Sequence, residues 1–214
     1  MARSRLALLA AAALVTAVVG SVLVFGIARP PQLASVADQP DPSPPAAVAW
    51  RSVERGDGCV SVARPDGSSA QLVCESDLGE VLAWDDDGIV VGGGRWPGEL
   101  RWLDRTTGEV LERRSVDDPW ELDPRGRGSV VSRVRDGVLT VRYEDTVLWE
   151  VEAPEGYRIT EGTVSPDGSW VAMVDTTARL LVVPADGSAP PRIWAEEAVT
   201  WSTPVWEGTL LDGP

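Results

Sequence analysis

The chain has 214 residues and a formal net charge of -14, and it contains no histidine. All 19 basic side chains are arginine, because lysine does not occur. This composition excludes a Ser-His-Asp triad, a Ser-Lys dyad, an imidazole metal centre and a phosphate-binding loop with its lysine. An acidic chain also repels phosphates, so no nucleic-acid partner is expected.

The composition also points to a source. Arg, Ala, Gly, Pro and Trp have GC-rich codons, whereas Lys and Asn are absent and Tyr and Phe number only 2 and 1. This pattern indicates a high-GC bacterium. No acidic residue precedes Asp38, so the part from residue 29 onward has 33 acids against 17 arginines, a formal charge of -16. We interpret this charge as a solubility device, with a cationic ligand or calcium as the alternative.

An uncharged apolar run covers residues 6–28, directly after Arg3 and Arg5. As a helix it would be roughly 34 Å long, enough to cross a hydrocarbon core of about 30 Å. The positive-inside rule then predicts a cytoplasmic tip at 1–5, a transmembrane signal-anchor at 6–28 and a C-terminal domain outside the cytoplasm. We therefore expect a single-pass protein of the cell membrane.

A cleaved signal peptide is the alternative interpretation. A small-x-small site occurs at Ser35-Val36-Ala37, but it lies well beyond an apolar run that is longer than the usual ~7–15 residues. No cysteine follows the run closely, which excludes a lipoprotein signal. Residues 29–48 contain six prolines and are expected to form a semi-rigid linker that holds the domain off the membrane.

From residue 49 to 214, short Val, Leu, Ile and Trp runs alternate with Gly, Pro and Asp, which predicts an all-β domain. The turns recur. One series lies at Asp66-Gly67, Thr107-Gly108, Asp145-Thr146 and Asp186-Gly187, with steps of 41, 38 and 41 residues. A second lies at Asp87-Gly88, Arg125-Gly126 and Asp167-Gly168, with steps of 38 and 42. A period near 40 with four strands per unit is typical of propeller blades.

Three units can be assigned in full. The first has predicted strands at 81–84, 89–91, 100–104 and 110–113. The second has them at 120–122, 129–134, 139–143 and 147–151. The third has them at 159–164, 170–174, 180–183 and 193–195.

The two ends of the domain are predicted to complete a fourth, composite unit. The C-terminal part supplies 198–201 and 209–211, the N-terminal part supplies 59–64 and 70–74, and 49–53 is a spare or second strand. Pairing the ends would remove exposed edge strands. We therefore expect a small propeller-like domain of about four four-stranded units, with an open β-meander or sandwich as the alternative.

Two segments carry a resemblance to known families. Val164–Ala172, with the sequence VSPDGSWVA, resembles the core of TolB-type, WD40-like propeller repeats. Leu103–Leu111, with the sequence LDRTTGEVL, is similar to the hairpin of quinoprotein-like propeller repeats. The resemblance implies a β-propeller that serves as a binding scaffold or substrate-channel domain, and it supports a fold more than an activity.

The only cysteines, Cys59 and Cys74, are placed symmetrically about the Asp66-Gly67 turn. A two-residue hairpin there would set them directly opposite each other, and an oxidising compartment would join them in a disulfide worth about 3 kcal/mol. A strict two-residue register makes them a hydrogen-bonded pair, which suits a bridge less well. A longer turn or a bulge would relieve this. Without a Cys-x-x-Cys motif, no redox role is expected.

Other polar groups have simple structural interpretations. The run Asp85–Gly88 offers oxygen ligands for calcium but lacks EF-hand spacing, and a turn between strands explains it equally well. The adjacent acids Asp117 and Asp118 are interpreted as a chance pair among many. We therefore expect no cofactor, no metal and no catalytic site.

A candidate binding face follows from propeller geometry, in which loops after second and fourth strands leave on one side. Most of the ten tryptophans lie in predicted strands, where they would pack between units. Trp96 and Trp120 are different: Trp96 falls in the loop at 92–98 and Trp120 begins a unit after the break at 117–119, and these two loop classes leave on the same side. The predicted face consists of Arg95, Trp96, Trp120, Arg135 and Tyr157. Aromatic and arginine side chains are the types enriched at interface hot spots.

Together these features predict a membrane-tethered, extracytoplasmic binding domain whose partner is an envelope protein or cell-wall component. A carbohydrate- or peptidoglycan-binding module is the second hypothesis, and a hydrolase that uses only carboxylates is the third.

Overall fold

The structure, a computed structural model, describes residues 30–38, 42–54, 56–93, 98–116, 130–200 and 202–210. Nearly all of them belong to one compact unit, Pro31–Pro214. The predicted cytoplasmic tip and transmembrane helix lie outside the described residues. Within the described part of the chain, no helix is both long and apolar enough to cross a membrane.

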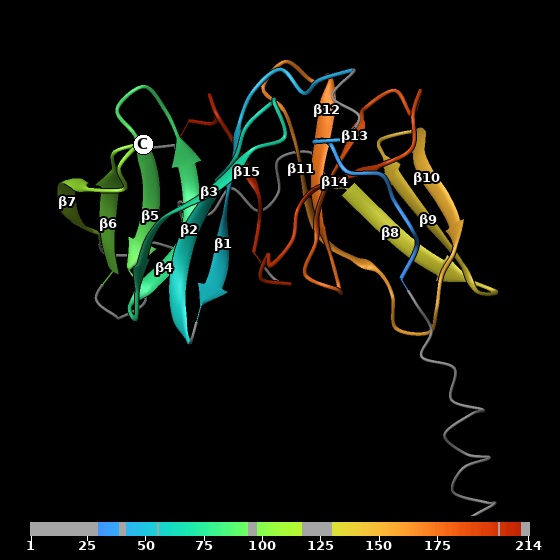
Figure 1. Ribbon diagram of the computed structural model, residues 1–214, viewed down its shortest axis with the longest axis horizontal. Coiled ribbons are helices and arrows are strands. Elements are labelled where there is room, and N and C mark those ends of the chain that lie inside the picture. Colours follow the sequence, from blue (N-terminus) through green and yellow to red (C-terminus); the bar gives the residue numbers. More distant parts are fainter. Residues whose placement is uncertain are drawn as a thin grey trace, which may run out of the picture. The chain divides into compact units, whose positions relative to one another are not determined.

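Every regular element in the described ranges is a β-strand, and the strands form four antiparallel sheets (Figure 1). One sheet has the order β15 (Val205–Trp206), β1 (Val48–Glu54), β2 (Asp57–Ala63) and β3 (Ser69–Glu75). A second has β4 (Leu78–Trp84), β5 (Ile89–Gly93), β6 (Gly98–Leu103) and β7 (Val110–Val116). A third has β8 (Val130–Arg135), β9 (Val138–Tyr143) and β10 (Thr146–Glu152). The fourth has β11 (Ile159–Val164), β12 (Trp170–Asp175), β13 (Leu180–Pro184) and β14 (Arg192–Ala195).

These sheets confirm the predicted all-β class, and their described strands match those of the three units that were predicted in full. The strand predicted at 120–122 lies outside the described residues, so the described part of its sheet has three strands. The periodic turns explain the agreement, because each one ends a strand at a fixed distance from the next.

The sheet that contains β15 and β1 is composite, because the C-terminal strand pairs with the N-terminal one. Val48 pairs with Trp206 and Ala49 with Val205. The predicted C-terminal strands at 198–201 and 209–211 are not the ones used: Ala198 and Thr209 make only isolated bridges. The fully buried Trp206 packs into the core and thereby selects Val205–Trp206 as the pairing strand.

Because side chains alternate along a strand, the composite sheet and the β11–β14 sheet each have two apolar faces. On β1, Trp50 packs towards the β11–β14 sheet, whereas Ala49 packs towards the β4–β7 sheet. The opposite face of the β11–β14 sheet packs on β8–β10 through residues such as Met173 and Leu139. The composite sheet and the β11–β14 sheet are therefore each covered on both faces, and all six residues of β12 are buried.

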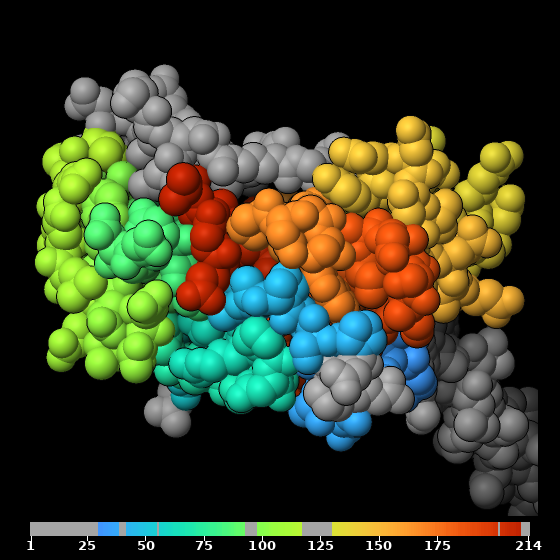
Figure 2. Space-filling view, turned by 90° about the horizontal axis from the view of Figure 1, so that it is seen from above, coloured from blue at the N-terminus to red at the C-terminus, as the bar shows by residue number. Residues whose placement is uncertain are grey.

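The proline-rich segment behaves differently from the free spacer that its composition predicts. Ser35 forms a parallel bridge with Ile193 at the edge of β14, and the Val36 amide donates to the Ile193 carbonyl over 2.8 Å. Val36 is fully buried in the core, and Arg192 donates to the Pro42 carbonyl. Figure 2 shows the blue residues of this segment beside the orange strands. Residues in this stretch cover a sheet edge rather than standing free.

The SPDG sequence forms the β11–β12 turn, which side-chain hydrogen bonds stabilise. Asp167 accepts from the Ser169 amide and hydroxyl over 3.1 and 2.7 Å, and also from the Ser165 hydroxyl. The Trp170 amide donates to the Ser165 hydroxyl over 3.0 Å. The Asp85 carboxylate, once a candidate calcium ligand, accepts from the amides of Asp87 and Gly88 in the same manner. These carboxylates shape turns.

Candidate functional site

The β2–β3 hairpin positions both the disulfide and the cavity described below. Its loop is longer than the predicted two residues, because the Arg64 amide donates to the Ser68 carbonyl and Gly67 has φ 82°. The register then shifts between the pairs Val60–Val73 and Ser61–Gln71. This shift compensates for the longer loop, so that Cys59 still pairs with Cys74.

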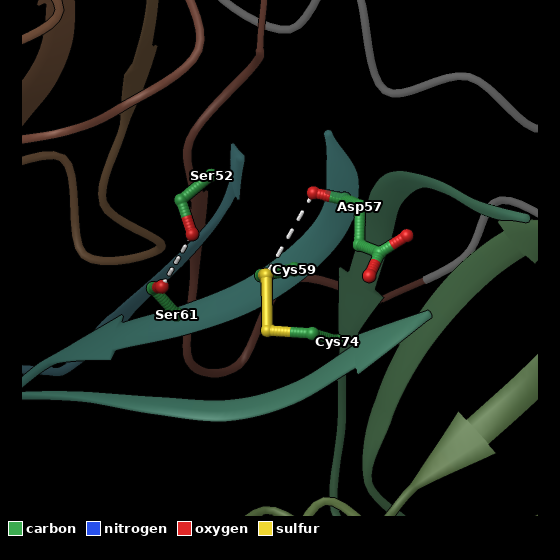
Figure 3. The surroundings of a disulfide bond; sticks show 5 residues. All are labelled: Ser52, Asp57, Cys59, Ser61 and Cys74. Atoms are coloured by element: carbon green, nitrogen blue, oxygen red, sulfur yellow. Dashed lines mark hydrogen bonds between the residues drawn. A yellow bond between two sulfur atoms is a disulfide. The ribbon is translucent and has the colours of Figure 1, made fainter. Parts of the chain in front are cut away.

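A disulfide joins Cys59 and Cys74, which lie directly opposite each other on β2 and β3 (Figure 3). The longer loop and the bulge are the features expected to relieve the strict two-residue register. The Glu54 carboxylate lies within 4.8 Å of both sulfur atoms. Since the sulfurs are bonded to each other, this cluster offers no thiolate to a metal.

A cavity of about 390 Å³ lies on the same face of the composite sheet. Strand alternation brings Trp50 and Ser52 of β1 to this face, and Ser61 of β2 stands opposite Trp50. Strand β3 and the chain after β14 supply the rest of the wall. Among the lining residues are Trp50, Ser52, Ser61, Gln71, Glu196 and Glu197.

The Glu196–Glu197 segment is held beside β1 by backbone contacts. Ala198 forms an antiparallel bridge with Ser52, and the Val199 amide donates to the Arg51 carbonyl over 3.1 Å. Glu197 adopts a left-handed φ of 69°, while both glutamate side chains are exposed. The closure of the sheet by the C-terminal part of the chain therefore places two carboxylates at the mouth of the cavity.

Buried polar groups lie beneath the cavity. Trp50 is only 2% exposed, and its Nε1 is buried without a hydrogen-bond partner among the described residues, as is Trp84 Nε1. The hydroxyls of Ser52 and Ser61 lie 2.7 Å apart, so one of them donates to the other (Figure 3). The accepting hydroxyl keeps its own hydrogen for another partner. The carboxylates at the mouth suit a ligand that carries a positive charge.

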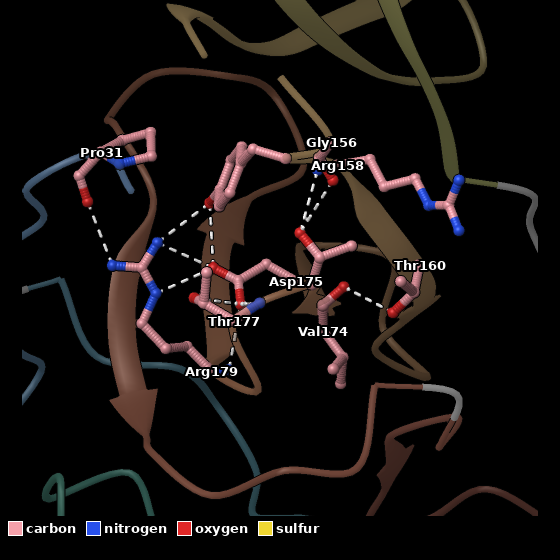
Figure 4. Close-up of polar contacts among 10 residues, drawn as sticks. Pro31, Gly156, Arg158, Thr160, Val174, Asp175, Thr177 and Arg179 are labelled. Carbon is pink, nitrogen blue, oxygen red and sulfur yellow. Dashed lines mark hydrogen bonds and ion pairs between the residues drawn. The ribbon is translucent and has the colours of Figure 1, made fainter. Parts of the chain in front are cut away.

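A second buried polar cluster, formed by Asp175, Arg179 and Tyr157, is closed (Figure 4). Arg179 Nε and Nη2 lie 2.8 and 2.7 Å from Asp175 Oδ2, and Nη1 donates to the Pro31 carbonyl over 3.0 Å. The Tyr157 hydroxyl donates to Asp175 over 2.9 Å and accepts from Arg179 over 3.0 Å. Burial and the charge of Asp175 raise the pKa of Tyr157.

This cluster corrects the expectation for Tyr157, which was placed in an exposed loop of the candidate binding face. The side chain is 3% exposed and packs edge-on against Trp149. It is therefore unavailable to a partner. Its neighbours explain why: the Asp175–Arg179 pair supplies the hydrogen bonds that a buried phenol requires.

Arg135 is exposed, with 93% of its side chain accessible. It flanks a two-residue turn, Asp136-Gly137, with φ values of 53° and 79°, so this loop is short rather than long. The other predicted face residues, Arg95, Trp96 and Trp120, lie outside the described residues. Of the predicted face, the structure describes only Arg135 and Tyr157, and Arg135 alone of these two is exposed.

The described tryptophans are buried, and all but Trp102 belong to core clusters that join two or more sheets; Trp102 packs within the β4–β7 sheet, with Arg114 over its ring. They are 8% exposed or less, and they are Trp50, Trp84, Trp102, Trp149, Trp170, Trp194 and Trp206. Among the described residues, no tryptophan therefore offers an open ring for stacking on a sugar.

Sequence reasoning missed the cavity because its walls come from distant segments. Residues near 50–71 meet residues near 196 only after β15 pairs with β1. The adjacent Glu196-Glu197 pair just beyond a strand was the one available signal, and 33 acids in the chain obscured it.

Comparisons with known proteins leave the chain without a family. No protein-family model matches it. No curated protein matches it. Among solved structures, BamB from Moraxella catarrhalis is similar, with 11% identity and a TM-score of 0.18; the match covers 72% of this chain and 65% of that chain. The chain thus spans less than two thirds of that protein's length, and the function is inferred from the chain's own geometry.

Proposed function

We propose that this chain is a membrane-tethered, extracytoplasmic binding domain with a four-unit propeller fold and a protein partner from the envelope. The observation that carries the binding role is the open cavity of about 390 Å³ with the carboxylates of Glu196 and Glu197 at its mouth. A volume of this order lies in the range of small-ligand sites.

The propeller arrangement rests on how the sheets adjoin. Each described sheet is a run of antiparallel strands, and the composite sheet joins the two ends of the domain. Strand β4 lies against β1 and β15, while β11 lies against β15 and β8. The strands at the inner ends of the sheets thus face one another, as the first strands of blades do around a propeller axis.

The tether and the location rest on sequence and on cysteine chemistry. The uncharged run at 6–28 is long enough to span a bilayer, and arginines precede it. A disulfide between the only two cysteines fits an oxidising compartment.

Binding is favoured over carboxylate-based hydrolysis by the titration of the acids. A general acid requires a raised pKa. Six described carboxyl groups have pKa values lowered through hydrogen bonds from turn groups or arginines, and these are Asp66, Glu99, Asp104, Glu112, Asp167 and Asp186. A protein partner is favoured over a glycan because the described tryptophan rings are buried.

The location is tested by fractionating cells and sequencing the mature N-terminus. We expect a membrane-bound product that retains residues 6–28 and is digested by external protease in spheroplasts. A soluble product that begins at Asp38 would refute the tether, and protection from the protease would refute the orientation.

The binding role is tested by site-specific photocrosslinking of the full-length protein in native membranes. A photoreactive residue at Gln71, on the cavity wall, should capture one discrete partner. The same residue at the exposed position Glu155, outside the cavity lining, is the matched control. Equal capture at both positions, or none at Gln71, would contradict the proposal.

A further inference from the structure

We infer that the outer face of the β8–β10 sheet binds the same face of a second copy of this chain, about a twofold axis that runs along β9. The outer face is the one turned away from the β11–β14 sheet. This self-association goes beyond the proposed binding role and makes no use of the cavity. Three features carry it: the exposure of the face, the order of the charges across its strands and the symmetry of that order.

The β8–β10 sheet has one face in the core and the other in solvent. Leu139 and Val141 of β9 are fully buried in the core cluster that joins this sheet to β11–β14. The side chains that alternate with them point to the outer face. There, Val131 of β8 and Val147 of β10 are 43% and 42% exposed, and both are paired with Arg142 of β9. No described sheet therefore covers this face, although it carries apolar side chains.

The charges on the outer face are sorted by strand. β8 contributes Arg133 and Arg135, β10 contributes Glu150 and Glu152, and all four are exposed. In the register of the sheet, Arg133 and Glu150 belong to one row across the strands, and Arg135 and Glu152 belong to the next. Two strand spacings, about 10 Å, separate the two charges of each row. A basic column thus runs along one side of the face and an acidic column along the other.

A twofold axis along β9 makes this order self-complementary. When two such faces are stacked, a half-turn about this axis carries β8 of one copy over β10 of the other without a shift along the strands. Arg133 then lies over Glu150 of the second copy and Arg135 over Glu152, and each pair occurs twice. Aligned sheets pack about 10 Å apart, a gap that an arginine and a glutamate side chain fill together. The same rotation sets Val131 over Val147.

The contacts that two of these arginines make within one copy are compatible with the pairing. Arg135 Nε lies 3.7 Å from Asp136 Oδ2, and because both side chains are more than nine-tenths exposed, this contact has little energy to lose. Arg142, which would meet its own copy near the axis, donates from Nη2 to the Asp145 carbonyl over 2.8 Å. Its charge is thereby held at the β9–β10 turn, at the end of the contact.

The composition of the face favours a second copy over other partners. An anionic membrane or a nucleic acid would be attracted by the arginines but repelled by the acidic column on β10. A face of three strands buries less than the ~1,200–2,000 Å² of a standard interface, so the pairing is weak in solution. The proposed membrane tether would strengthen it by raising the local concentration of copies.

The test uses full-length protein with two different affinity tags, coexpressed and extracted from membranes in mild detergent. Capture of one tag should bring down the other. Arg133→Glu in both copies, or Glu150→Arg in both, should lower this co-capture by about tenfold, because each variant sets like charges face to face. An Arg133→Glu copy coexpressed with a Glu150→Arg copy should restore it, since every facing pair is then of opposite charge.

A cysteine on the axis locates the contact. Thr140 of β9 lies between Arg133 and Glu150 in the register, so it would meet Thr140 of the second copy. Thr140→Cys in membranes treated with copper phenanthroline should give a disulfide-linked dimer. Glu155→Cys, exposed and outside the face, is the matched control and should give at least about tenfold less. The thermal unfolding curve of each variant verifies that it is folded.

Three outcomes would overturn the inference. They are co-capture that the charge reversals leave unchanged, a mixed pair of variants that is captured no better than either variant alone, and equal dimer yields from Thr140→Cys and Glu155→Cys. Photocrosslinking from Gln71 concerns the cavity, so the binding role stands or falls separately from this contact.

Discussion

Two polar regions of this domain differ in one respect. In the cluster of Asp175, Arg179 and Tyr157, the carboxylate, guanidinium and phenol are joined to one another, and Arg179 also reaches the Pro31 carbonyl. In the cavity, the buried Trp50 Nε1 has no partner among the described residues. Both regions bury polar atoms beside a tryptophan-rich core, yet only the first satisfies them.

The difference separates architecture from function. A buried polar group that lacks a partner costs stability, so such groups are rare and each calls for an explanation. The satisfied cluster explains itself, because it fastens the turn after β12 to Tyr157 and to the proline-rich segment. The buried Trp50 Nε1 has no such partner among the described residues, so its burial costs stability and fastens nothing. The predictions below are ordered from the largest expected effect to the smallest.

Breaking the closed cluster should have the largest effect on stability. Arg179→Met leaves the fully buried Asp175 without its cation, and removing one member of a buried pair typically costs about 3–5 kcal/mol. The free energy of unfolding by urea measures the loss. Arg135→Met, at an exposed site, is the matched control and should cost nothing measurable. A loss below about 1 kcal/mol at Arg179 would show that the cluster does not stabilise the fold.

Removing the disulfide should have the next largest effect. Closing the loop between Cys59 and Cys74 is worth about 3 kcal/mol by chain entropy, so the double variant Cys59→Ala/Cys74→Ala should lose roughly that amount. Intact mass with and without reduction decides whether the bond forms in cells. Two free thiols in protein isolated from the envelope would contradict the disulfide.

Ser52→Ala should cost less, about 1 kcal/mol, because it removes one hydrogen bond from a pair that remains open to the cavity. Its value lies in the contrast with Arg179→Met. Ser52→Ala should weaken partner capture more than it lowers stability, and Arg179→Met should lower stability more than it weakens capture. Urea unfolding and photocrosslinking from Gln71 measure the contrast in both variants. If Ser52→Ala destabilises as much as Arg179→Met, the cavity floor is structural.

The smallest effect expected is a loss of stability in acid. Hydrogen bonds from turn groups hold the pKa values of Asp66, Asp104, Asp167 and Asp186 below the usual range. Their contribution is complete above the unfolded pKa of about 3.9 and is lost as pH falls through the lower folded values. Unfolding curves between pH 6 and 2 should show this loss, and Asp167→Asn should flatten it. Constant stability down to pH 2 would contradict the assignment.

The sequence allowed much of the fold to be predicted, because its signals are local. The Asp167-Gly168 turn and its counterparts mark strand ends directly, and the spacing of Cys59 and Cys74 about a turn indicates their pairing. The longer β2–β3 loop and the bulge that compensates for it were anticipated only as ways to relieve the cysteine register. No residue pattern decided that both would occur.

Non-local features were not predictable from sequence. Tyr157 is buried because Asp175 and Arg179, about twenty residues away in the chain, supply its hydrogen bonds. Val36 belongs to the predicted linker, yet it pairs with the edge strand β14 and is buried in the core. The cavity exists only once β15 closes the composite sheet, and no periodic pattern encodes that meeting. A candidate site assembled from loop positions alone therefore selected Tyr157, which the fold buries.

The most direct test of the binding role is photocrosslinking of the full-length protein in native membranes from Gln71, which lines the cavity, and from Glu155, which is exposed outside it. We predict that a photoreactive residue at Gln71 captures one discrete partner and that the same residue at Glu155 does not. Equal capture at both positions, or none at Gln71, would contradict the proposal that this cavity is the binding site.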